Sequence, residues 1–157
     1  MQVWRICHRK YIETAYTGEG TQKAGGRWTP KGVSAVYTAG SLSLAALEML
    51  IKFSEQNFPD EFIAIPAEVP DNVERTVYKS EDLPLTWREV PPPIALQEIG
   101  KIWLSKGETA VLSVPSAVIP LENNFLLNPG HPDFTSIRIR APMSFSFDPR
   151  LMGGRVG

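Results

Sequence analysis

The stretch from Gly25 to Glu48 constrains the fold more than any other part of the chain, because a loop signal, a strand signal and a helix signal follow one another in it. It begins G-G-R-W-T-P-K-G, whose glycines and proline indicate a loop. Residues 33–38 are mostly small or β-branched and predict a strand. Ser41 is a good helix N-cap, and apolar residues follow it at helical spacing. This unit could bring together an arginine, a tyrosine and a glutamate that hold a phosphorylated, sugar-bearing ligand: Arg27, Tyr37 and Glu48.

Several further strands and one more helix are expected in the rest of the chain. Strand patterns occur at residues 2–7, 62–69, 73–78, 109–114 and 136–139, and a helical pattern occurs at 94–105. Pro66 indicates that its strand is an edge strand or carries a bulge. The glycine-rich residues 17–26 predict a loop without regular structure, and the proline-rich residues 80–93 predict a connection too stiff for the interior of a helix.

The length and the mixture of elements predict one compact domain. A chain of 157 residues and 17.4 kDa is close to the usual size of a single domain. Short strands with two clear helices predict an α+β fold with a mostly antiparallel sheet core and flanking helices. We expect the domain to span residues 1–147, followed by a flexible C-terminal tail at 148–157.

Charge and cysteine content exclude some classes of function. The net charge of −1 and the pI near 6.1 argue against a general nucleic-acid or membrane-surface binder. The single cysteine, Cys7, suits a reducing compartment. No apolar run reaches the length of a signal or membrane segment, so we expect a cytoplasmic protein. One cysteine and two distant histidines give no metal-ligand spacing, and no metal is expected.

Familiar catalytic motifs are missing from the sequence. It contains neither a P-loop nor a G-x-G-x-x-G motif between a strand and a helix. A triad of Ser116, His131 and Asp133 can be drawn, but Ser116 lacks the G-x-S-x-G nucleophile elbow. Cys7 has His8 as its neighbour, yet adjacent strand residues point to opposite faces. We therefore interpret Cys7 as a buried apolar side chain and His131 as a turn residue.

The remaining polar and aromatic residues suit cleavage of an N-glycosidic bond to a positively charged base. Arginines can clamp a diphosphate, and an aromatic face can stack on the departing ring. A glutamate can hold ribose hydroxyls and stabilise an oxocarbenium-like transition state. Because the leaving group is already cationic, such a reaction needs neither a metal nor a covalent nucleophile. The residues concerned are Arg5, Arg27, Trp28, Tyr37, Glu48 and Ser116.

Three motifs resemble the RES domain family, named for arginine, glutamate and serine. They read G-G-R-W, V-Y-T-A-G-S-L-S-L-A-A-L-E and V-P-S-A-V-I-P-L-E-N-N-F-L-L-N-P-G-H-P-D-F. The resemblance extends to about Ile139 and implies a fold like that of diphtheria-toxin-like ADP-ribosyltransferases. It also implies a bacterial toxin that consumes NAD+, splits off nicotinamide and passes ADP-ribose to water or phosphate. NAD+ would be a substrate, and no cofactor is implied.

The resemblance assigns catalytic roles to Arg27, Tyr37, Glu48 and Ser116. We expect Arg27 to neutralise the NAD+ diphosphate, Tyr37 to stack on the nicotinamide or its ribose, and Ser116 to hydrogen-bond the nicotinamide side. Glu48 would stabilise the ribosyl cation. Further substrate-binding residues are expected at Arg5, Trp28 and Asn128. The residues alone also allow a strand aromatic at Tyr37, a turn hydroxyl at Ser116 and a core-filling side chain at Trp28.

Other activities and partners follow from the same pattern. One alternative is a mono-ADP-ribosyltransferase that modifies a host protein, and another is a non-catalytic module that senses a nucleotide. The resemblance implies an Xre-type helix-turn-helix antitoxin as partner. Phe145 and Phe147 are candidates for a contact between two copies in a homodimer.

Overall fold

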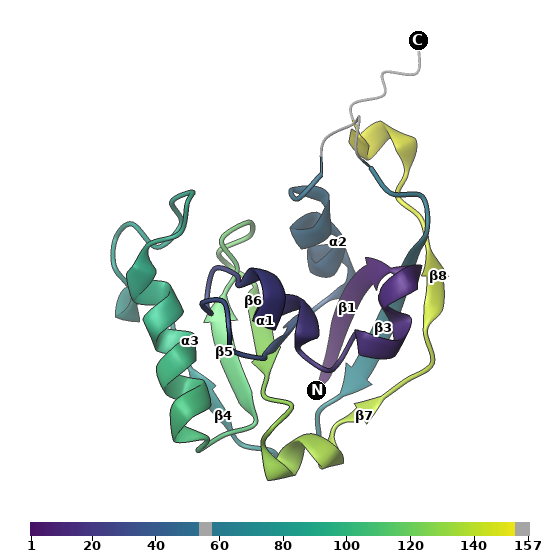
Figure 1. Cartoon of the computed structure of the whole chain (residues 1–157). Helices are drawn as coiled ribbons and strands as arrows, with labels where there is room; N and C mark the ends of the chain where they lie inside the picture. The colour runs from purple at the N-terminus through teal and green to yellow at the C-terminus, as the bar shows by residue number, and fades with distance from the viewer. Residues whose placement is uncertain (54–57, 153–157) are drawn as a thin grey trace.

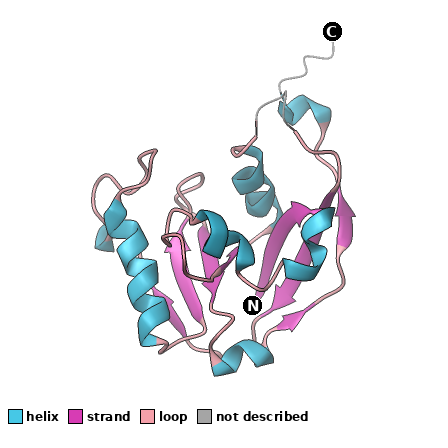
Figure 2. Ribbon diagram, in the orientation of Figure 1, coloured by secondary structure: helices cyan, strands magenta, loops and turns pink. Residues whose placement is uncertain are grey.

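The computed structural model describes residues 1–53 and 58–152, and within them a single sheet of eight strands is surrounded by short helices (Figure 1, Figure 2). The strands are β1 (Gln2–His8), β2 (Val36–Ala39), β3 (Phe62–Glu68), β4 (Arg75–Val77), β5 (Val111–Pro115), β6 (Asn123–Leu127), β7 (Arg138–Ile139) and β8 (Met143–Phe145). The helices are α1 (Glu19–Ala24), α2 (Leu42–Leu50) and α3 (Ile94–Lys106). In the described part of the chain, 3-10 turns span Arg9–Thr14, Ser80–Asp82, Pro132–Ser136 and Pro149–Met152. No helix in the described part of the chain is long and apolar enough to cross a membrane.

The strand order is β4-β5-β6-β2-β1-β3-β7, and β8 also pairs with β3. Strands β4 and β5 run parallel to each other, while the other recorded pairs are antiparallel. The structure therefore confirms the predicted α+β fold with a mostly antiparallel sheet.

The sheet opens between its two central strands. Strands β1 and β3 are aligned along their full lengths, from Gln2 opposite Glu68 to His8 opposite Phe62. Strands β1 and β2, by contrast, are aligned at a single recorded pair among the described residues, Trp4 with Ala39. Because the two strands diverge beyond this pair, they leave a fork in the middle of the sheet.

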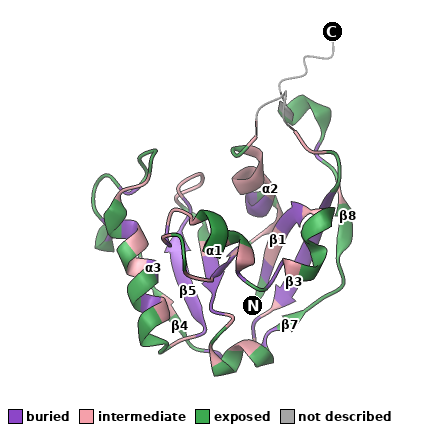
Figure 3. Ribbon diagram, viewed as in Figure 1, coloured by how far each residue is buried: buried purple, intermediate pink, exposed green. Residues whose placement is uncertain are grey.

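Helices cover both halves of the sheet and bury most of its strands (Figure 3). Helix α3 lies beside β4 and β5 in Figure 1, and its Leu96 and Trp103 share a core cluster with Leu112 and Val114 of β5. Helix α2 packs on β1 and β2, where Leu44 and Ala45 meet Ile6 and Ala39. Burial of these apolar side chains is the main stabilising contribution to the fold.

Two local predictions were wrong. The segment at 17–26 was expected to lack regular structure, but it contains α1, with Gly18 and Gly25, both of positive φ, at its two ends. The strand of Pro66 is an interior strand, since β1 lies on one side of it and β7 and β8 on the other. The Pro66 carbonyl accepts the Arg140 N–H at 2.9 Å, on the side of β3 that faces β7 and β8. Because the nitrogen and the carbonyl of a strand residue point to the same side, the Pro66 nitrogen faces the gap between β7 and β8. An interior proline is tolerated there because no partner strand needs its missing N–H.

The C-terminal part packs against the domain by aromatic contacts. Phe147 is buried, with its ring centroid 5.0 Å from that of Phe58 and 4.9 Å from that of Phe145. Its burial within its own chain contradicts the prediction that Phe147 is available for a contact between copies. The predicted tail at 148–157 is only partly described, because residues 153–157 lie outside the described residues, and residues 149–152 form a 3-10 turn.

Candidate active site

A cavity of about 650 Å³ occupies the fork between β1 and β2. Strand β1, the turn at Arg9–Thr14 and helices α1 and α2 form its walls. Its volume is in the range of small-molecule sites. The polar side chains of its lining include Arg5, Tyr37, Glu48, Lys52 and Asn124.

Glu48 is the carboxylate of α2 that lines this cavity. Its helix starts as predicted, because the Ser41 hydroxyl accepts the Leu44 N–H at 3.1 Å and caps the first turn. Glu48 Oε1 accepts two hydrogen bonds, one from Ser116 Oγ at 2.7 Å and one from Asn124 Nδ2 at 2.5 Å. No hydrogen bond to Oε2 is present among the described residues. One oxygen is thus fixed, and the other is left for a ligand.

Ser116 lies directly behind Glu48, immediately after β5. It is fully buried, and its Oγ accepts the N–H groups of Val118 at 3.1 Å and Ile119 at 3.0 Å while donating to Glu48. The hydroxyl is therefore both the cap of a local turn and a donor to the carboxylate. Since these bonds use its hydrogen-bonding capacity, the geometry favours a role in holding Glu48 over the expected contact with nicotinamide.

Asn124 is a member of the site that sequence reasoning missed. It lies on β6, where its backbone is aligned with Ala39 of β2 and Val114 of β5. Its Oδ1 is buried without a hydrogen-bond partner in the described structure. Asn124 is the second of two asparagines that open β6 before three apolar residues, and strands are depleted in this residue type.

Tyr37 holds the loop that carries Arg27. Its hydroxyl accepts the Trp28 N–H at 3.0 Å and hydrogen-bonds Thr29 Oγ1 at 2.9 Å. Burial raises the pKa of Tyr37 to about 12, so the hydroxyl stays protonated at neutral pH. A Cβ at Gly26 would lie 2.7 Å from this hydroxyl, which explains the glycine there. Trp28 itself is buried in the core beside α3, so its ring fills the interior.

Arg27 is fixed by the proline-rich segment at 80–93. Its Nη1 donates to the carbonyl oxygens of Trp87 at 2.8 Å and Glu89 at 3.0 Å. Partial burial lowers the pKa of Arg27, while the nearby negative charge of Glu48 acts in the opposite direction. Arg27 is thus close enough to Glu48 for electrostatic interaction, although it is not among the residues that line the cavity.

Among the cations that line the cavity, Arg5 and Lys52 lie near each other. Arg5 reaches across the fork, where its Nη1 donates to the Tyr37 carbonyl at 2.9 Å, and its Nε is buried without a partner in the described residues. Lys52 retains contact with solvent, but the surrounding cavity wall removes part of its hydration. This desolvation, and then the charge of Arg5, lower the pKa of Lys52, whereas Glu48 raises it. Lys52 was also missed by sequence reasoning.

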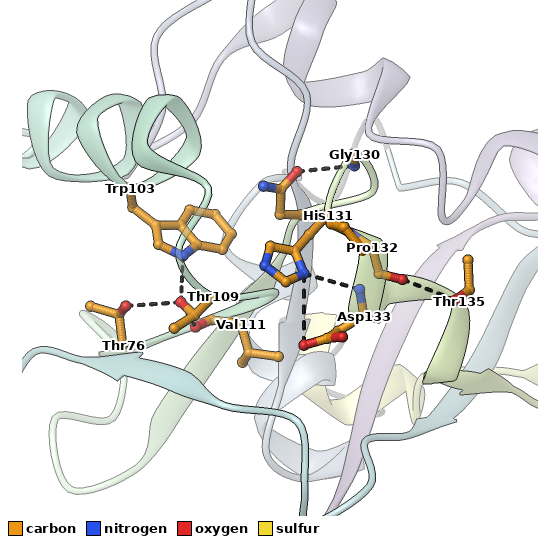
Figure 4. Close-up of polar contacts among 10 residues, drawn as sticks. Thr76, Trp103, Thr109, Val111, Gly130, His131, Pro132, Asp133 and Thr135 are labelled. Atoms are coloured by element: carbon orange, nitrogen blue, oxygen red, sulfur yellow. Dashed lines mark hydrogen bonds and ion pairs between the residues drawn. The ribbon is translucent and has the colours of Figure 1, made fainter.

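Asn128 and the drawn triad lie away from this cavity. Asn128 follows β6 at the opposite end of this strand from Asn124. Its Oδ1 accepts the Gly130 N–H at 3.0 Å, and its backbone N–H donates to the Ala110 carbonyl. His131 Nδ1 accepts the Asp133 N–H at 3.0 Å in the loop shown in Figure 4. The antiparallel register of β5 and β6 places Ser116 and this loop at opposite strand ends, at least about 13 Å apart. The triad is therefore not assembled, and His131 is a turn residue as predicted.

The described residues contain no group of three side chains suited to hold a metal ion. Cys7 is buried at the cavity wall, and burial raises the pKa of its thiol. A raised pKa disfavours the thiolate, so Cys7 lacks the properties of a nucleophile.

Comparison with known proteins gives consistent results. A model of the RES domain matches residues 2–148. A protein named "Toxin Res" from Yersinia enterocolitica is 40% identical over 152 residues, which cover 96% of this chain and 99% of that protein. A "Toxin Res" from Photorhabdus laumondii is 35% identical, with 97% of each chain covered. A "Prs ADP-ribosylating toxin" from Sphingobium is 35% identical, with 95% of each chain covered.

A solved structure has the same fold. A chain in the crystal structure of the M. tuberculosis MbcT–MbcA toxin–antitoxin complex superimposes with a TM-score of 0.73 at 16% sequence identity. The match covers 97% of this chain and 86% of that chain.

Proposed function

The chain belongs to the RES domain family, and we propose that it is the toxin of a toxin–antitoxin pair that cleaves the bond between nicotinamide and ribose in NAD+. Three observations support this proposal. Its relatives are named as toxins, and one relative's name refers to ADP-ribosylation, a chemistry that consumes NAD+. The cavity, moreover, contains the carboxylate of Glu48, which is fixed by two hydrogen bonds, and the cations Arg5 and Lys52.

The observation that carries the proposal is the fixation of Glu48 by Ser116 and Asn124. When the glycosidic bond breaks, its electron pair moves to the pyridinium nitrogen, and nicotinamide leaves as a neutral molecule. Positive charge then develops on the ribosyl carbon. A carboxylate that is already oriented stabilises this charge without having to reorganise. The Oε2 atom of Glu48 is the atom available to meet the ribose, because Oε1 is occupied.

The cations around Glu48 suit the diphosphate of NAD+. Arg5 and Lys52 line the cavity, and Arg27 lies close to Glu48. Guanidinium groups bind phosphate oxygens by paired hydrogen bonds, and the unpartnered Nε of Arg5 is a donor in need of an acceptor. Tyr37 also lines the cavity, but its hydroxyl is hydrogen-bonded to the Trp28 N–H. We therefore assign it two roles: its ring contacts the substrate, and its hydroxyl supports the loop that carries Arg27.

The acceptor of the ADP-ribosyl group is either inorganic phosphate or water. Phosphate attack on the ribosyl carbon gives ADP-ribose phosphate, and water attack gives ADP-ribose with release of one proton. Incubation with NAD+ in phosphate buffer and in a phosphate-free buffer, followed by separation of products, tests the proposal. We expect nicotinamide in the phosphate buffer for either acceptor. Release in both buffers together with ADP-ribose identifies water as the acceptor, whereas release in phosphate buffer alone together with ADP-ribose phosphate identifies phosphate. Unchanged NAD+ in both buffers would contradict the proposal.

Transfer to a protein is the second candidate activity, because it agrees with the name of the Sphingobium relative. It would use the same cavity, with a side chain of a target protein as acceptor. NAD+ labelled in its adenosine part distinguishes the two activities in a cell extract. Label on a discrete protein band supports protein modification, whereas label in free small molecules supports NAD+ depletion.

We further propose an Xre-type antitoxin as the partner of this chain. A toxin with an open substrate cavity requires an inhibitor in the cell that makes it, and the structurally similar chain comes from a toxin–antitoxin complex. Co-expression with a candidate Xre-type helix-turn-helix protein should restore growth and yield a stable complex on size exclusion.

A further inference from the structure

The amide of Asn124 has only one favourable orientation at the site. Its Nδ2 lies 2.5 Å from Glu48 Oε1, and an ionised carboxylate can only accept hydrogen bonds. Turning the amide over would place Oδ1 against the carboxylate, with two acceptors in contact. The contact with Glu48 therefore determines which way Asn124 points.

This orientation leaves Oδ1 in an unfavourable place. Oδ1 is buried and has no hydrogen-bond partner among the described residues. A buried acceptor without a donor opposes folding, and such atoms are rare in proteins. An apolar residue of similar size would avoid this cost at that position of β6. The asparagine is thus better explained by its contact with Glu48 than by the stability of the sheet.

The backbone beneath Asn124 is held on both sides. Strand β6 lies between β2 and β5, and Asn124 is aligned with Ala39 on one side and Val114 on the other. Side chains placed on paired strands are positioned more precisely than side chains on loops. Ser116 approaches the same carboxylate oxygen from the end of β5. Helix α2, strand β6 and the turn after β5 therefore converge on one atom, Glu48 Oε1.

We propose that Asn124 is a positioning residue that, together with Ser116, fixes Oε1 of Glu48 so that Oε2 faces the ribose of the substrate. This inference rests on the proposed function for the identity of the substrate, but the contact itself does not depend on the reaction. Without the Asn124 donor, the carboxyl group can rotate about its last torsion. A misplacement of a reacting group by about 1 Å costs roughly 100-fold in rate.

The first test compares Asn124→Ala and Asn124→Asp with the matched control Asn123→Ala. Asn123 is exposed and is the preceding residue on β6, so its side chain points to the other face. We expect both Asn124 variants to lower kcat for nicotinamide release by roughly 100-fold with little change in KM. The control should retain wild-type kcat. Equal kcat in wild type and both Asn124 variants would overturn the proposal.

The pH profile of Asn124→Asp separates positioning from a merely structural role. Aspartate keeps the shape of asparagine but places a second negative charge against Glu48. At low pH the two carboxyl groups share a proton, which restores a donor between them. The activity of this variant relative to wild type should therefore rise as the pH falls. A constant ratio across the pH range would contradict the assigned role.

A stability measurement distinguishes failure of this inference from failure of the proposed function. Melting temperatures are compared for wild type, Glu48→Ala, Asn124→Ala and the double variant. The shift caused by Asn124→Ala should differ between the wild-type and Glu48→Ala backgrounds, because contacting residues are not additive. Additive shifts would overturn the inference even if NAD+ is cleaved. If the wild-type protein leaves NAD+ intact but the melting-temperature shifts are clearly non-additive, the proposed reaction is wrong and the contact between Asn124 and Glu48 still holds.

Discussion

Ser116 Oγ donates a hydrogen bond to Glu48 Oε1 over 2.7 Å, although 68 positions separate the two residues in the chain. The bond joins the end of β5 to the second half of α2 across one wall of the cavity. Because the same hydroxyl accepts two backbone N–H groups, the turn that follows β5 and the carboxylate on α2 are held by one atom. The folding of this turn and the orientation of Glu48 are therefore coupled.

Replacement of Ser116 by alanine should affect stability and turnover together. The N–H groups of Val118 and Ile119 lose their acceptor, and unsatisfied buried groups cost about 1–3 kcal/mol in the free energy of unfolding. Glu48 also loses one of its two donors, so kcat should fall. Denaturant unfolding and nicotinamide release measure the two effects. Ser113→Ala is the control, since Ser113 is buried on β5 and the hydrogen bonds to Glu48 in the described structure come from Ser116 and Asn124. Unchanged kcat in Ser116→Ala would refute the coupling.

Alkaline pH should destabilise the protein through Tyr37. Burial raises the pKa of Tyr37 to about 12, above the value of about 10 for an unfolded tyrosine. Between these values the unfolded chain releases a proton that the folded chain retains. Stability is therefore complete below pH 10 and is lost as the pH rises toward 12, by about 1.4 kcal/mol per pH unit for this group.

Circular dichroism of denaturant unfolding between about pH 8 and 12 measures this loss. Tyr37→Phe should have a shallower decline with pH than the wild type, and it should be less stable at pH 8 because the Trp28 N–H loses its acceptor. Tyr11→Phe is the control, because Tyr11 is exposed. Identical slopes for Tyr37→Phe and the wild type would show that Tyr37 does not carry the effect.

Replacement of Arg27 by lysine should weaken substrate binding. Lysine keeps the charge but loses the planar fork, and it cannot hold the carbonyl groups of Trp87 and Glu89 while also binding a diphosphate. We expect KM for NAD+ to rise by about 10-fold or more. KM is measured by steady-state kinetics. The control Arg138→Lys, at an exposed arginine paired with Glu68, should keep the wild-type KM. A normal KM in Arg27→Lys would exclude Arg27 from diphosphate binding.

Lys52→Met tests the cation that the sequence did not reveal. Lys52 lines the cavity beside Arg5, and methionine preserves most of its apolar stem. Loss of one charge-assisted contact should raise KM for NAD+ or for phosphate by about 5- to 10-fold. The control is Lys101→Met on the exposed face of α3. The role of Lys52 would be wrong if both variants bound substrate as the wild type does.

The sequence predicted those features whose determinants are local. The Ser41 cap and the spacing of apolar residues after it are sufficient to place α2, and the structure confirms this helix. The motif resemblance identified Glu48 and Ser116, and the structure brings these two into contact. The 17–26 segment was misjudged because its glycines, which permit the positive φ at both ends of α1, were interpreted as breaking any helix.

Features that depend on non-local pairing could not be predicted. Asn124 and Lys52 enter the site because of the register of β6 with β2 and the way α2 lies on the fork, neither of which is visible in local patterns. Asn128 was expected at the site because its motif adjoins Ser116, but the antiparallel return of β6 carries it to the far end of the sheet. The interior position of Pro66 likewise depends on two separate short strands that leave a gap at its nitrogen.

Nicotinamide release by Glu48→Gln and by the wild type is the most direct test of the central claim. Glutamine preserves the side-chain length and can still accept from Ser116 and Asn124, but it removes the negative charge that would stabilise the ribosyl cation. We predict a fall in kcat of roughly 100-fold or more with a melting temperature close to that of the wild type. If Glu48→Gln releases nicotinamide from NAD+ as fast as the wild type, the assignment of Glu48 as the charge-stabilising group is wrong.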